Sequence, residues 1–129
     1  LLLVSVAVAA FLIYLPFFVV GYARFAIGYN QSAPRTMLPK LPPYAQRATW
    51  AHENAFESMM LYAPAALMAY MTQQQSMIAL GSVVAYLVAR SLYPLFYILD
   101  IPLLRSLMFA IANIGTFTLY FLSCRAALL

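Results

Sequence analysis

Side chains able to bind a charged ligand gather in four short stretches of a chain that is otherwise apolar. The set comprises Arg24, Arg47, Asn54, Glu57, Arg90, Tyr93, Tyr97 and Arg105. Guanidinium groups bind carboxylates, and a carboxylate such as that of Glu57 binds an ammonium group. A single histidine and a single cysteine offer no cluster of metal ligands, so we expect no metal site. The chemistry to expect from these residue types is ligand binding.

The spacing of these residues suits helices. Arg47, Asn54 and Glu57 follow at i, i+7 and i+10, and Arg90, Tyr93 and Tyr97 repeat at intervals of three and four residues. Each set therefore lines one face of a helix. Two such polar faces can oppose each other in a bundle.

The composition identifies the surroundings of these helices as lipid. Of the 129 residues, 66% are hydrophobic and 8% are charged, whereas soluble proteins carry about 25% charged residues. The net charge of +4 comes from scattered bases that form no run or stripe, which argues against nucleic acid as a partner. We predict a single all-α domain in a lipid bilayer.

Four transmembrane helices account for most of the chain. Apolar runs and helix breakers predict helices at about 1–24, 44–71, 77–99 and 103–124, with a long polar, proline-rich loop at 28–43. The first apolar run is longer than the roughly 7–15 residues of a signal-peptide core, so we interpret it as a span. Antiparallel alternation then brings the four polar stretches to one membrane face.

The distribution of basic residues predicts the orientation. Arg24, Arg35, Lys40 and Arg47 lie in or beside the long loop, whereas the opposite face has only Arg125. By the positive-inside rule the long loop is cytoplasmic, and both termini lie on the other side of the membrane.

Simpler explanations exist for single members of the set. An arginine near a helix end often extends to the lipid headgroups, and tyrosines favour the interface. Glu57 and Asn54 could equally form a structural pair with Arg90 or Arg105 of another helix. His52 fits a hydrogen-bonded helix residue better than a metal ligand.

The segment from Gln46 to Glu57, QRATWAHENAFE, resembles the helix-two signature of the MAPEG family, the membrane-associated proteins in eicosanoid and glutathione metabolism. The segment from Arg90 to Tyr97 is similar to the Arg, Tyr, Tyr spacing of leukotriene-conjugating members. The pair Arg105-Ser106 stands where the family has an Arg-Ser pair at the start of helix four. The resemblance extends over the whole chain.

This resemblance implies a homotrimer of four-helix subunits that holds glutathione between adjacent subunits near the cytoplasmic face. The positions that would contact glutathione are Asn54, Glu57, Arg90, Tyr93 and Tyr97, joined by Arg24 at the end of helix one and by Arg47. Arg105 corresponds to the arginine that stabilises the glutathione thiolate, and would be the catalytic residue. A hydrophobic small molecule would reach the sulfur from the bilayer.

Two positions depart from the family pattern. Where eicosanoid-making members have arginines four residues and one residue before the asparagine, this chain has Trp50 and Glu53. Together with Ala51-His52 these residues resemble the short bacterial branch, which implies a bacterial inner membrane rather than prostaglandin or leukotriene synthesis.

Three hypotheses on function follow. The first is a glutathione-dependent transferase or lipid hydroperoxide reductase. The second is a non-catalytic protein of the same fold, such as an accessory subunit of a larger membrane complex, in which the buried polar residues are interhelical pairs. A small transporter has little support, because the four spans show no inverted repeat.

Overall fold

The computed structural model describes all 129 residues as helices joined by short connections, without β-strands. The elements are α1 (Leu2–Ile13), α2 (Leu15–Ala26), the 3₁₀ helix η1 (Pro34–Lys40), α3 (Pro43–Met71), α4 (Met77–Ile98) and α5 (Pro102–Leu128). The prediction of an all-α protein is confirmed. The predicted ends of the last three helices differ from the observed ones by at most one residue, except that α5 continues to Leu128.

The prediction of one continuous first helix was wrong, and the chain has five α-helices instead of four. The helix is interrupted at Tyr14, which separates α1 from α2. Pro16 has no N–H to donate to the carbonyl of Leu12, so the regular hydrogen-bond ladder fails at this point. Together α1 and α2 still form one apolar stretch, Leu2–Ala26, long enough to cross a membrane.

Three stretches have the length and composition of membrane spans: Leu2–Ala26, Met77–Ile98 and Pro102–Leu128. The helix α3 has 29 residues, which is about 43 Å at 1.5 Å per residue and long enough for a bilayer. Because its first half is polar, α3 is not among the three apolar stretches. A fourth span, and with it a four-helix bundle, therefore stays a prediction.

The loop predicted at 28–43 is partly ordered as η1. Met37 in the middle of η1 and Leu41 directly after it are buried. Leu41 joins Val20, Ala23, Ala45 and Ala48 in a small second core between α2 and α3. The loop is therefore packed onto the helices.

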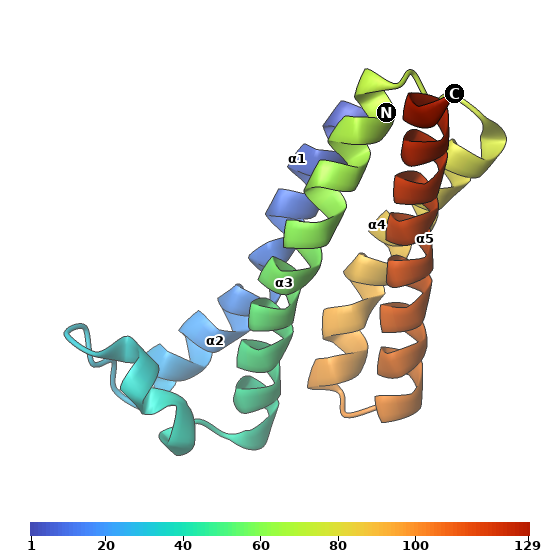
Figure 1. Cartoon of the computed structure of the whole chain (residues 1–129). Helices are drawn as coiled ribbons and strands as arrows, with labels where there is room; N and C mark the ends of the chain where they lie inside the picture. Colours follow the sequence, from blue (N-terminus) through green and yellow to red (C-terminus); the bar gives the residue numbers. More distant parts are fainter.

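Different elements lie at the two ends of the molecule (Figure 1). Both termini and the α3–α4 turn lie at one end, and η1 and the α4–α5 turn lie at the other, which we call the loop face. The antiparallel alternation predicted from the sequence is present. It places the end of α2, the start of α3, the end of α4 and the start of α5 at the loop face.

Small residues bring the helices close together. In the main core α3 contributes Ala65, Ala66 and Ala69. At Gly115 of α5 an added Cβ would lie 2.8 Å from the carbonyl oxygen of Ser82 in α4, so α4 and α5 touch at backbone level. The two helices that carry Arg90 and Arg105 are thus packed against each other.

Candidate functional site

Five of the predicted site residues form one group at the loop face, which we call the arginine–tyrosine cluster: Asn54, Arg90, Tyr93, Tyr97 and Arg105. Its centre is Arg90, only 5% exposed. The Arg90 Nη1 donates a hydrogen bond of 2.9 Å to Oδ1 of Asn54, and its Cζ lies 4.3 Å from the centroid of the Tyr93 ring. An amide oxygen and an aromatic face thus surround a cation that has no acidic partner.

The second guanidinium of the cluster is more accessible. Arg105 is half-buried at the start of α5, and its Nη1 donates to the hydroxyl oxygen of Tyr93 at 3.3 Å. Its Cζ lies 5.0 Å from the centroid of the Tyr97 ring. Both tyrosines come from α4, which packs closely against α5 at Gly115. Arg105 is therefore a positioned, partly open cation able to stabilise an anion beside it.

Arg47 lies near the cluster but has another contact. Its Nε donates to the carbonyl oxygen of Tyr97 at 3.1 Å, and its Nη2 donates to that of Ile98 at 3.0 Å. The last carbonyls of a helix lack partners within the helix and carry partial negative charge. Arg47 therefore caps the end of α4, and its predicted contact with glutathione stays a prediction.

The structure does not bring the other two predicted residues to this cluster. Glu57 is exposed on α3 and pairs with no base in the chain. Arg24 lines a separate cavity between α2, η1 and α3. Within a single chain the residues predicted as one site are thus divided: five form the cluster, Arg47 lies beside it, Arg24 lines the separate cavity, and Glu57 belongs to neither.

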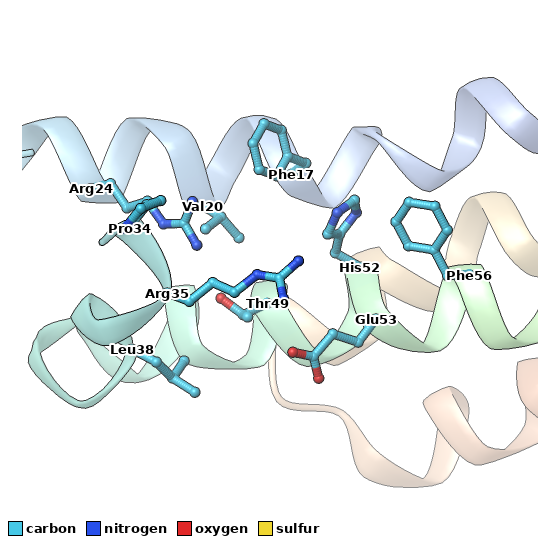
Figure 2. A pocket seen from close by; sticks show the side chains of 10 residues that line it. All are labelled: Phe17, Val20, Arg24, Pro34, Arg35, Leu38, Thr49, His52, Glu53 and Phe56. Carbon is cyan, nitrogen blue, oxygen red and sulfur yellow. The ribbon is translucent and has the colours of Figure 1, made fainter. Parts of the chain in front are cut away.

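We call the second place the α2–η1–α3 cavity. It has a volume of about 340 Å³. Its lining comes from three elements: Phe17, Val20 and Arg24 of α2, Pro34, Arg35 and Leu38 of η1, and Thr49, His52, Glu53 and Phe56 of α3. Figure 2 shows Arg24 and Arg35 extending into the space between α2 and α3. The lining is therefore mixed, with polar and charged side chains beside apolar ones.

The charges of this cavity have no partners in the chain. The Arg24 Nε is buried without a hydrogen-bond acceptor. Neither Arg35 nor Glu53 takes part in a salt bridge. Two guanidinium groups and one carboxylate are therefore free to bind a ligand.

His52 connects this cavity to the break in the first span. Its Nδ1 lies 2.7 Å from the carbonyl oxygen of Ile13, and since a carbonyl only accepts, Nδ1 is the donor. Its ring packs against Tyr14, Phe17 and Phe56. His52 thus supports the break between α1 and α2, in agreement with its interpretation as a hydrogen-bonded helix residue.

Sequence reasoning missed Arg35 and Glu53 as possible ligand contacts. Arg35 entered only as a topology signal, and Glu53 only as a departure from the family pattern. One signal in the sequence could have found Glu53. It directly precedes Asn54, and consecutive helix residues point about 100° apart, so its side chain faces a different neighbour from that of Asn54. No group of three histidine, cysteine, aspartate or glutamate side chains is placed to hold a metal ion.

The helices define the class of protein. A helical chain with three apolar stretches long enough to span a bilayer is an integral membrane protein. The chain belongs to the MAPEG family, whose model matches residues 1–125. No curated protein and no solved structure matches the chain. Membership confirms the resemblance inferred from the helix-two segment and supports a glutathione-related or eicosanoid-related membrane protein.

Proposed function

We propose that this protein is a glutathione-dependent transferase or peroxidase that acts on hydrophobic substrates from the bilayer. The observation that carries the proposal is Arg105, a half-buried guanidinium held by the Tyr93 hydroxyl and the Tyr97 ring. Family membership supplies glutathione as the expected co-substrate.

The proposed reaction depends on ionisation of the glutathione thiol. A cysteine-type thiol has a pKa of about 8.5 and is mostly protonated at neutral pH. A guanidinium beside the sulfur favours the thiolate, which is the nucleophile. In transfer, the thiolate forms a bond to the electrophilic carbon, and the leaving group departs with its electron pair. In peroxide reduction, two glutathione molecules become a disulfide while the hydroperoxide becomes an alcohol and water.

We propose that the complete site forms between adjacent copies of the chain, as the homotrimer expected from the family would allow. Arg24 lines the α2–η1–α3 cavity, whereas Arg105 at the start of α5 contacts Tyr93. A ligand that touches both would be held by two adjacent chains in this arrangement. Glu57 supports this arrangement. It is exposed about 21 Å along α3 from Pro43, where an unpaired carboxylate facing lipid is unfavourable. A neighbouring copy or a bound ligand would cover it.

Turnover by an Arg105→Ala variant tests the mechanism. The purified protein should conjugate glutathione to a model electrophile, and the variant should lose about 100-fold or more in turnover, as expected when one group that stabilises the developing charge is removed. Arg125→Ala is the matched control, because Arg125 lies at the opposite end of α5. Both variants should keep the oligomeric state of the wild type in size-exclusion chromatography with light scattering. Unchanged turnover in Arg105→Ala would refute the assignment.

The second candidate is a non-catalytic protein of the same family, for example an accessory subunit. It is favoured by Arg90 and Arg47, whose guanidinium groups already have partners inside the chain, and by Trp50, which is 40% exposed where related enzymes have arginine. Calorimetry in detergent separates the two candidates. Heat of binding at millimolar glutathione supports the first, and its absence supports the second.

A further inference from the structure

The α2–η1–α3 cavity contains the free charges that a peptide ligand needs. Of the arginines near the loop face, Arg90 is bonded to Asn54 and Arg47 caps α4. Arg24 and Arg35 have no such partners. Carboxylate groups of a ligand would therefore bind best at Arg24 and Arg35.

Glu53 lines the same cavity from α3. An exposed carboxylate in the lining of the same cavity as two guanidinium groups is unsuited to a purely anionic ligand, which it would repel. It suits a ligand that carries an ammonium group close to its carboxylates. The cavity offers two positive charges and one negative charge, and glutathione presents two carboxylates and one ammonium. An ethanolamine phospholipid headgroup has one charge of each sign and would leave one arginine unpaired.

We propose that Glu53 is a specificity-determining residue that selects peptide thiols with a free ammonium group. In this assignment Glu53 binds the ammonium of the γ-glutamyl end, and Arg24 and Arg35 bind the carboxylates. Glu53 and Glu57 are both exposed, but Glu57, which the sequence favoured for the ammonium, does not line the cavity. The inference rests on the proposed binding of glutathione and adds a specific preference to it.

Binding of two matched peptides tests the preference. S-methylglutathione and its N-acetyl derivative differ in the ammonium group, and neither has a reactive thiol. Titration calorimetry of the purified wild-type protein in detergent should give about fivefold tighter binding of the free amine, which is the order expected for a partly solvated charged pair.

Variants at Glu53 should remove the preference. In Glu53→Gln the ratio of the two affinities should fall close to one, and in Glu53→Arg the N-acetyl peptide should bind more tightly. Asp100→Asn is the matched control, since Asp100 is an acid outside the cavity with φ of 61°, a conformation that asparagine tolerates. It should keep the wild-type ratio.

The outcomes separate this inference from the proposed function. If S-methylglutathione binds but its preference over the N-acetyl peptide is absent, or is unchanged in Glu53→Gln, the role of Glu53 is refuted and glutathione binding stands. If neither peptide binds the wild type, the proposed function itself is overturned, and the inference with it.

Discussion

Arg90 and Arg24 show how the same residue type serves two purposes in one chain. Arg90 is buried and bonded to Asn54, with the Tyr93 ring against its guanidinium. Arg24 is half-buried, and its Nε has no acceptor. A buried cation with partners holds helices together, whereas one without partners is available to a ligand.

Removing the partner of Arg90 should destabilise the protein. In Asn54→Ala the buried guanidinium loses its acceptor, at a cost of about 1–3 kcal/mol in the free energy of unfolding. Unfolding by dodecyl sulfate in mixed micelles, followed by circular dichroism, measures this change.

Asn113→Ala is the control for that measurement. Asn113 is a half-buried amide in α5 and bonds to no other residue. Its replacement should change the free energy of unfolding by no more than about 0.5 kcal/mol. Equal effects of the two substitutions would contradict a stabilising role for the Asn54–Arg90 hydrogen bond.

At the scale of elements, interrupted and capped helices determine the geometry of both sites. The break at Tyr14 separates α1 from α2. The helix α3 supports this break through His52, and it caps the end of α4 through Arg47. One helix thus contacts both the broken first span and the arginine–tyrosine cluster.

The backbones of α4 and α5 approach closely at Gly115, and this contact can be tested there. A methyl group there would lie 2.8 Å from the Ser82 carbonyl oxygen, so Gly115→Ala should push the helices apart and lower the free energy of unfolding by about 1–3 kcal/mol. The Gly115→Ala variant should also lose turnover in the proposed reaction, because Arg105 is on α5 and its tyrosine partners are on α4.

Gly81→Ala is the matched control. Nothing lies within 4 Å of the added carbon at Gly81, and alanine favours a helix over glycine by about 1 kcal/mol. This substitution should therefore leave the protein as stable or slightly more stable. A neutral Gly115→Ala variant would show that α4 and α5 can separate without cost.

At the scale of the whole molecule, the chain has chemically different ends. The loop face contains η1, the arginine–tyrosine cluster and the α2–η1–α3 cavity. The opposite end contains both termini and the α3–α4 turn (Figure 1). The excess of basic residues at the loop face predicts that it is cytoplasmic.

The single cysteine makes this orientation testable. Cys124 is exposed near the end of α5, and a membrane-impermeant maleimide should label it in intact bacterial cells expressing the protein. In a Cys124→Ser background, Thr36→Cys in the exposed part of η1 should be labelled only after the cells are opened. The reverse pattern would place the loop face outside.

The sequence by itself determined the class of protein, the ends of α3 and α4 and the start of α5, and the gathering of polar residues at one face. These properties depend on local hydropathy, on breakers such as Pro43 and Pro102, and on simple alternation. The helix-two segment also identified the family. None of this required knowledge of which helices touch.

Only the tertiary structure decided how the polar residues are divided. Glu53 and Asn54 are neighbours in the sequence, yet one lines the α2–η1–α3 cavity and the other binds Arg90. The reason is that a step of one residue turns a helix by about 100°, so the partner of each side chain depends on how α2 and α4 pack around α3. The break at Tyr14 has a local cause in Pro16, but its contact with His52 of α3 depends on packing.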